Sequence, residues 1–157
     1  KPAPPRKPSA QPGGLVNRGG DRHRTVEPAV IGQMEIPRIG IDHPVVEGID
    51  MPQLHWGPGH WPGPAMPGQL GNTVFAGHRV THTRPFLDID KLVVGDQIVL
   101  RMPRGDYTYE VTGSQVVGPK DLWIVKQTPE ATITIFACHP KGSARQRYVV
   151  RGKLIDG

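Results

Sequence analysis

The sequence holds a single cysteine, Cys138, and this thiol limits the chemistry that the chain can carry out. A lone cysteine cannot form an intramolecular disulfide, so it is either a small buried apolar residue or a nucleophile. A nucleophilic thiol needs a base and a group that stabilises an anion close to it in space. The residue by itself leaves both interpretations open.

Motifs for other kinds of chemistry are absent from the sequence. With one cysteine the sequence cannot hold a CxxC motif, and its seven histidines do not form the HExxH motif of a metal site. The sequence also lacks a Walker motif, a dinucleotide-binding fingerprint and internal repeats. We therefore predict no metal and no cofactor.

The excess positive charge of the chain lies near its N-terminus. The net charge is +5, and six of the 19 basic residues but one of the 14 acidic residues lie within residues 1–24. The remaining 13 basic and 13 acidic residues balance, so the folded part has no basic bias to match a phosphate backbone, and nucleic-acid binding is not expected. Residues 1–28 are rich in proline and predict a disordered basic linker before a folded domain at 29–157. The linker is either a solvated spacer or a membrane-proximal stalk.

The composition favours short strands joined by turns. Glycine and proline supply 38 of the 157 residues, which disfavours a helical bundle. The spacing of Phe86, Ile89 and Leu92 predicts one helix over 85–93, and residues 48–72 are expected to form a long ordered loop or a short helical turn. Runs of apolar and β-branched residues predict strands at 34–36, 41–46, 73–77, 97–102, 107–117, 132–138 and 147–155. The predicted fold is all-β: a barrel of about eight strands with one or two short helices and long connecting loops.

Several blocks of the sequence, in order, resemble one protein family. They are IPRIGIDHPVVEG at 36–48, GPGHWPGPAMPGQLGN at 57–72, AGHR at 76–79, PFLDIDKLVVGDQI at 85–98 and TITIFACHPKGSARQRYVVRGKL at 132–154. Over residues 32–154 the chain resembles the sortases, the cysteine transpeptidases of Gram-positive cell surfaces. The combination of AGHR and CHPKGSARQR is most similar to the class E sortases of actinobacteria.

The resemblance implies three catalytic residues, each beside the end of a predicted strand. Cys138 corresponds to the nucleophile and His78 to the general acid/base. Arg147 corresponds to the cation that stabilises the thiolate and the oxyanion of a tetrahedral intermediate. A cysteine, a histidine and an arginine at these positions are compatible with a site assembled from three strand ends.

Other residues compete for two of these roles. His139 adjoins the cysteine, but neighbours on an extended chain point to opposite sides, so it is the weaker candidate for the base. Arg145 and Arg151 share a strand face with Arg147 if the strand is regular. Only the resemblance, through the pattern QRYVV at 146–150, selects Arg147.

Four further residues are candidate substrate contacts. The family's TLxTC strand has a threonine before its cysteine, where this chain has Ala137. Class E members have GHRTTY, whereas this chain has His82 in place of the tyrosine, directly after Thr81. His60 is expected either to line the substrate groove or to cap a turn. Trp61 is expected to anchor its loop on the barrel rather than to touch substrate.

The resemblance also implies an activity, its partners and a location. The activity is cleavage of an LPxTG- or LAxTG-type sorting signal before its glycine, through a thioacyl intermediate on the cysteine. The acyl group then passes to an amine of a cell-wall precursor or of a pilin lysine. The expected location is extracytoplasmic, with membrane anchoring by a helix upstream of Lys1. A hydrolytic thiol peptidase and a non-catalytic β-barrel binding module are the alternatives.

Overall fold

The computed structural model describes residues 29–63, 65–79, 85–139 and 145–157, with the backbone alone at Met51, Cys138 and His139. The predicted linker at 1–28 and the candidate substrate residues Thr81 and His82 lie outside these ranges. Within them, every helix is too short or too polar to cross a membrane.

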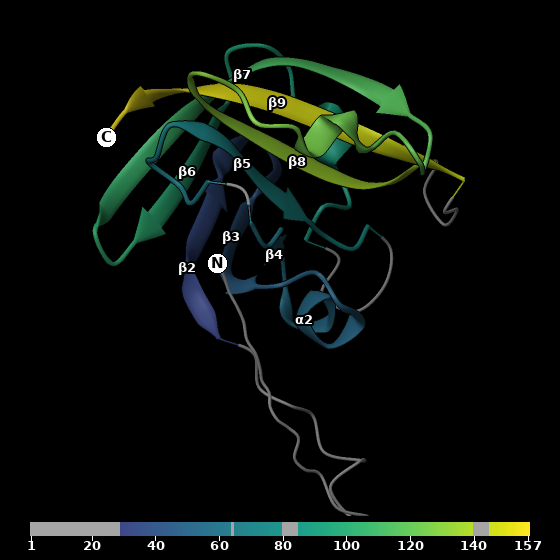
Figure 1. Cartoon of the computed structure of the whole chain (residues 1–157), viewed down its shortest axis with the longest axis horizontal. Helices are drawn as coiled ribbons and strands as arrows, with labels where there is room; N and C mark the ends of the chain where they lie inside the picture. The colour runs from purple at the N-terminus through teal and green to yellow at the C-terminus, as the bar shows by residue number, and fades with distance from the viewer. Residues whose placement is uncertain (1–28, 64, 80–84, 140–144) are drawn as a thin grey trace, which may run out of the picture.

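Eight strands close into a barrel in the order β2-β3-β4-β5-β8-β9-β7-β6 (Figure 1). They are β2 (Val30–Ile36), β3 (Ile41–Glu47), β4 (Gly59–His60), β5 (Gly71–Ala76), β6 (Gln97–Met102), β7 (Gly105–Val117), β8 (Ala131–His139) and β9 (Gln146–Asp156). The pairs β3·β4 and β5·β8 are parallel, and the other neighbouring strands are antiparallel. The predicted all-β barrel is confirmed.

Short helices connect the strands. They are α2 (Met51–Trp56) and the 3-10 helices η3 (Pro37–Ile39), η4 (Ile89–Lys91) and η5 (Leu122–Val125). Helix α2 and strand β4 both lie in the Gly- and Pro-rich segment at 48–72. The helix agrees with one of the two expectations for that segment. The strand was not predicted, because two residues show no alternation.

The predicted helix over 85–93 is wrong. A turn leads into η4, which spans only three residues. The N–H of Ile89 donates to the Phe86 carbonyl at 3.2 Å, and the N–H of Leu92 donates to the Ile89 carbonyl at 3.3 Å. Residues three apart lie above one another in a 3-10 turn, so all three apolar side chains are buried without an α-helix.

Alternating residues fill the barrel. Residues two apart on the same strand are buried together in the main core; these pairs are Met34 and Ile36, Ile98 and Leu100, Tyr109 and Val111, and Ile133 and Ile135. Strand β5 is buried along its whole length. Val74 and Phe136 pack with Ile124 of η5 in a second cluster, so η5 covers the outer face of β5 and β8. The strands that lead to the predicted catalytic residues are therefore buried on both faces.

Candidate active site

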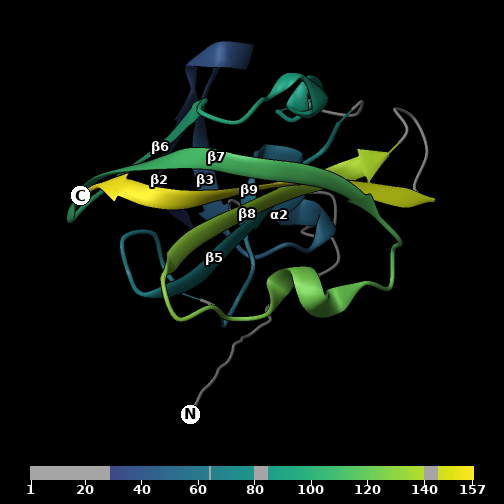
Figure 2. The ribbon, with the colours of Figure 1, turned by 90° about the horizontal axis from the view of Figure 1, so that it is seen from above.

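The strand register brings the three predicted catalytic residues to one end of the barrel. The parallel ladder of β5 and β8 ends at the pair Ala76–Phe136, and His78 and Cys138 each lie two residues beyond it. The antiparallel ladder of β8 and β9 pairs Cys138 directly with Arg147. Strands β5, β8 and β9 lie side by side with β8 in the middle (Figure 2), so the strand ends that lead to these three residues meet at one end of the barrel.

His78 is positioned by contacts on both sides of it. The N–H of Gly77 donates to the Phe136 carbonyl at 3.2 Å, which continues the contact of β5 with β8. The His78 carbonyl accepts a hydrogen bond from the N–H of Phe86 at 3.0 Å. The His78 ring is half-buried, and its centroid lies 5.7 Å from that of His55 on α2. These contacts place the imidazole at the end of β5.

Gly77 allows this segment to lie directly on the core. A Cβ atom at this position would lie 2.6 Å from Cδ2 of Phe86, whose ring is fully buried. Only glycine permits such a close approach of backbone to ring. The residue before His78 therefore rests on Phe86.

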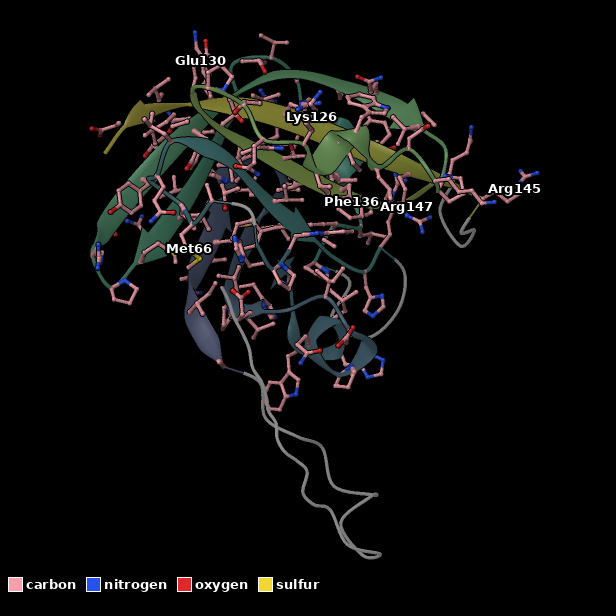
Figure 3. The ribbon with its side chains drawn as sticks, in the orientation of Figure 1. Met66, Lys126, Glu130, Phe136, Arg145 and Arg147 are labelled. Carbon is pink, nitrogen blue, oxygen red and sulfur yellow. The ribbon has the colours of Figure 1, made fainter. Side chains whose placement is uncertain are left out.

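Arg147 lies half-buried at the start of β9, where its Nη1 donates to the Gln146 carbonyl at 3.3 Å. The two competing arginines, Arg145 before β9 and Arg151 within it, lie elsewhere. Arg145 is exposed and points away from the barrel (Figure 3). The guanidinium of Arg151 lies over the ring of Trp123, 5.4 Å from its centroid. Of these three arginines, Arg147 is the one that reaches the pocket.

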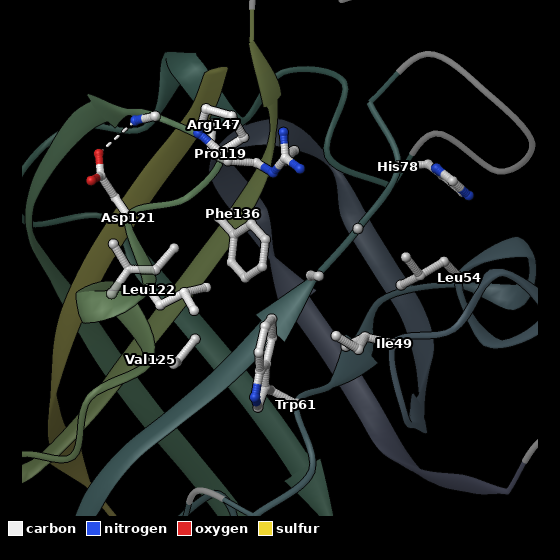
Figure 4. Close-up of a pocket in the computed structure, with 15 residues that line it drawn as sticks. Ile49, Leu54, Trp61, His78, Pro119, Asp121, Leu122, Val125, Phe136 and Arg147 are labelled. Carbon is white, nitrogen blue, oxygen red and sulfur yellow. Dashed lines mark hydrogen bonds between the residues drawn. The ribbon is translucent and has the colours of Figure 1, made fainter. Parts of the chain in front are cut away.

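A pocket of about 330 Å³ opens beside the strand ends. His78 and Arg147 lie at one end of it, and Ile49 and Trp61 lie further along (Figure 4). Its walls are mostly apolar; they include Ile49, Leu54, Trp61, Leu122, Ile124, Val125 and Phe136. Asp121 adds one carboxylate, which accepts a hydrogen bond from the N–H of Gly118 at 2.7 Å. The arrangement combines an apolar binding surface with two groups that can carry positive charge.

Two of the candidate substrate residues can be located. Ala137 is buried and lines the pocket. His60 is 1% exposed and is not among the pocket-lining residues. Its Nδ1 bonds to Oε1 of Glu47 at 2.9 Å, and its Nε2 bonds to the carbonyl of Ala65 at 2.9 Å. His60 thus ties β3 to the chain that follows β4, which corresponds to the turn-stabilising alternative.

The described side chains offer no metal site: within residues 29–63, 65–79, 85–139 and 145–157, no three His, Cys, Asp or Glu side chains come together to hold an ion.

Comparison with known proteins identifies the family. The family model for the sortase domain matches residues 34–155, which is most of the chain. The chain belongs to the sortase family. Sortase D of Bacillus subtilis is 34% identical to it over 128 residues, covering 79% of this chain and 63% of that protein. Sortase SrtE1 of Streptomyces coelicolor is 29% identical, covering 78% of this chain and 40% of that protein. This sortase chain thus spans less than two thirds of the length of either relative.

Solved sortase structures of different classes are similarly close. Sortase E of Streptomyces avermitilis, as its T196V mutant, aligns with a TM-score of 0.75 and 32% identity, covering 82% of this chain and 89% of that one. Sortase C of Clostridium perfringens, solved with the C-terminal cell wall sorting motif, aligns with a TM-score of 0.78 and 31% identity, covering 87% and 76%. These similarities support the family and the fold without separating the classes.

Most of the pocket of this sortase was not predicted from the sequence. Trp61 lines the pocket as well as packing on the barrel, where its ring centroid lies 6.1 Å from that of Phe136. Leu122 and Ile124 lie on a helix too short to show a periodicity. A usable signal was the apolar run LWIV at 122–125, between polar residues and shortly before the strand that carries the cysteine.

Proposed function

We propose that this chain is a sortase transpeptidase. In this proposal Cys138 cleaves a sorting signal of the LPxTG or LAxTG type before its glycine, and the acyl group passes to an amine of the cell wall or of a pilin. The observation that carries the proposal is the strand register, which pairs Cys138 with Arg147 and sets the end of β5, two residues before His78, beside β8, while His78 and Arg147 line one apolar pocket. Surface proteins or pilins that bear the signal are the expected partners.

The first half-reaction forms a thioester. The Cys138 thiolate attacks the carbonyl carbon of the residue before glycine, so a carbon–sulfur bond forms and the carbonyl oxygen becomes an oxyanion. The guanidinium of Arg147 stabilises this charge. His78, as imidazolium, donates its proton to the departing amine as the carbon–nitrogen bond breaks.

The second half-reaction reverses these roles. Neutral His78 accepts a proton from the incoming amine, whose nitrogen attacks the thioester carbonyl. A new amide bond forms, the carbon–sulfur bond breaks, and the thiolate returns. No redox change occurs, so no electron carrier is required. If water replaces the amine, the same residues carry out hydrolysis.

The pocket is suited to the apolar part of the signal. Its side chains from η5 and β8, including Ile124 and Phe136, would surround an aliphatic side chain and remove its apolar surface from water. Ala137 stands where the family has threonine, so the hydroxyl that could meet the substrate there is absent. Recognition would therefore depend more on apolar contact at this point.

Class and location complete the proposal. The AGHR and CHPKGSARQR segments support class E, and the resemblance to that class implies the LAxTG signal. The basic residues within 1–24 support an extracytoplasmic domain that is anchored at its N-terminal side, close to anionic lipid.

The test is intact-mass spectrometry of the reduced protein with LAxTG and LPxTG peptides, with and without a glycine-based amine. We expect an acyl adduct that is lost when amine is added, together with a ligated peptide. The variants Cys138→Ala, His78→Ala and Arg147→Lys should give none or far less. Release of acid alone in the presence of amine would identify a hydrolase. If no adduct forms on a thiol that still alkylates, and His78→Ala leaves alkylation unchanged, a non-catalytic module is indicated.

A further inference from the structure

One wall of the pocket comes from η5 rather than from a barrel strand. Leu122, Ile124 and Val125 line the pocket from this helix, which is four residues long. No side chain caps its N-terminus, and Leu122 and Trp123 are 63% and 44% exposed. So short a helix has little stability of its own. Its position must be set by other parts of the chain.

Asn72 of β5 holds the end of this helix. Its side chain is fully buried, and its Nδ2 donates to the Ile124 carbonyl at 3.1 Å and to the Lys126 carbonyl at 3.2 Å. Gln127 adds two bonds to the backbone of Asn72. Its Oε1 accepts from the Asn72 N–H at 3.1 Å, and its Nε2 donates to the Asn72 carbonyl at 3.0 Å. Four hydrogen bonds thus join one residue of β5 to the wall.

The oxygen of the Asn72 side-chain amide forms hydrogen bonds with β8. Oδ1 of Asn72 accepts hydrogen bonds from the hydroxyls of Thr132 at 3.2 Å and Thr134 at 2.9 Å. A primary amide has two N–H donors and one oxygen with two lone pairs, so every hydrogen-bonding position of this side chain is occupied. The two threonines hold the oxygen toward β8 and thereby direct the nitrogen toward η5.

Asn72 is remote from the reacting groups. It lies near the start of β5, six residues before His78, and does not line the pocket. Its bonds to η5 reach backbone carbonyls, so they locate the wall whatever side chains the wall carries. We propose that Asn72 is a positioning residue that sets the distance of η5 from β8, and through it the selectivity for the apolar side chain of the sorting signal. This inference rests on the proposed function.

The test compares variants that break different sides of the amide. Asn72→Ala removes the bonds to η5 and to β8. Thr134→Val keeps the shape of the threonine and removes one bond on the β8 side alone. Gln127→Leu removes two bonds between the wall and β5 at an exposed residue, so it keeps the test available if Asn72→Ala does not fold. Gln115→Leu, at an exposed glutamine of β7, is the matched control.

Kinetics with peptides that carry leucine, valine or alanine at the first position of the signal provide the main measurement. For Asn72→Ala we expect KM of the leucine peptide to rise roughly tenfold with kcat within about twofold, because ground-state contact is lost and the chemistry is not. The preference for leucine over alanine should fall by a similar factor. Gln127→Leu should raise KM and lower the preference for leucine, each by about threefold. Thr134→Val should change the preference less than Gln127→Leu does, because Thr132 still holds the amide oxygen. Gln115→Leu should keep the wild-type preference.

Hydrogen exchange gives a second readout that needs no turnover. Backbone amides of residues 120–128 should exchange faster in Asn72→Ala and Gln127→Leu, while alkylation of Cys138 keeps its wild-type rate. Wild-type selectivity in folded Asn72→Ala or Gln127→Leu would overturn the inference. If the wild-type protein acylates with no peptide, the proposed function fails. The positioning role is then judged by exchange alone, and unchanged exchange overturns it.

Discussion

Replacing Gly77 by alanine should damage both stability and catalysis. The added Cβ would lie 2.6 Å from Cδ2 and 2.8 Å from Cε2 of Phe86, whereas carbon atoms in contact normally lie about 3.5–4.0 Å apart. The ring or the backbone must therefore move by about 1 Å. Phe86 is fully buried and cannot swing into solvent. Overpacking of this kind costs about 1–3 kcal/mol of unfolding free energy.

The catalytic effect follows from the position of the strained residue. Gly77 precedes His78, so a displacement of about 1 Å at the backbone carries the imidazole with it. Misplacement of a catalytic group by this amount reduces rates on the order of 10²-fold. The assay is acyl transfer to a glycine-based amine, measured beside thermal unfolding and thiol alkylation. We expect Tm to fall by about 2–4 °C for each kcal/mol, with alkylation retained.

Two further variants identify the cause. Gly113→Ala on β7 is the matched control, because its Cβ would meet no atom within 4 Å. It should leave activity unchanged. The double variant Gly77→Ala, Phe86→Leu should lose less Tm than the two single variants lose together, because the smaller leucine side chain leaves space for the new Cβ. Wild-type Tm and activity in Gly77→Ala, or strict additivity in the double variant, would refute the reasoning.

Three other predictions concern residues outside the pocket. Burial raises the pKa of Tyr109, and this effect outweighs the opposing effect of the hydrogen bond that the Gly68 N–H donates to the hydroxyl. The stability that the neutral hydroxyl contributes is therefore complete below about pH 10, the pKa of an unfolded tyrosine, and is lost as the pH rises through the higher pKa of the folded state. Tyr109→Phe should therefore flatten the alkaline fall in urea-unfolding free energy while costing about 1 kcal/mol at neutral pH, and an unchanged alkaline slope would contradict this. The buried guanidinium of Arg79 donates to the Leu87 carbonyl at 3.3 Å and forms an ion pair with Asp90 at 3.0 Å. Arg79→Lys should lower the free energy of unfolding in urea by about 1–3 kcal/mol, because the ammonium of lysine cannot reproduce the planar guanidinium. Arg101 forms ion pairs with two carboxylates but is exposed to solvent, so Arg101→Ala should leave the urea midpoint nearly unchanged, and a large drop would show that surface pairs matter here.

The sequence was informative where its signals were local and repeated. Runs of apolar and β-branched residues, such as those at 41–46 and 132–138, predicted the strands, and enough strands implied a barrel. The short apolar strand before His78 and the β-branched strand before Cys138 placed both residues at strand ends. That these two ends are adjacent depends on the parallel pairing of β5 with β8, which no local pattern indicates.

The elements that were missed lack such signals. The spacing of Phe86, Ile89 and Leu92 fits both an α-helix and consecutive 3-10 turns, because both place residues three apart on one side. The role of Asn72 depends on partners between 52 and 62 residues away in the sequence. An asparagine at the start of a strand has many local uses, so its type alone does not reveal them.

The parallel pairing of β5 with β8 also has a kinetic consequence. The pair Asn72–Thr132 closes a segment of 60 residues, whereas Cys138 and Arg147 pair across nine. Short loops close faster and at a lower cost in entropy. During refolding the cysteine and the arginine can therefore meet before the histidine arrives. Recovery of acyl transfer should lag behind formation of the β8·β9 hairpin, and in that interval the thiol lacks its acid/base partner.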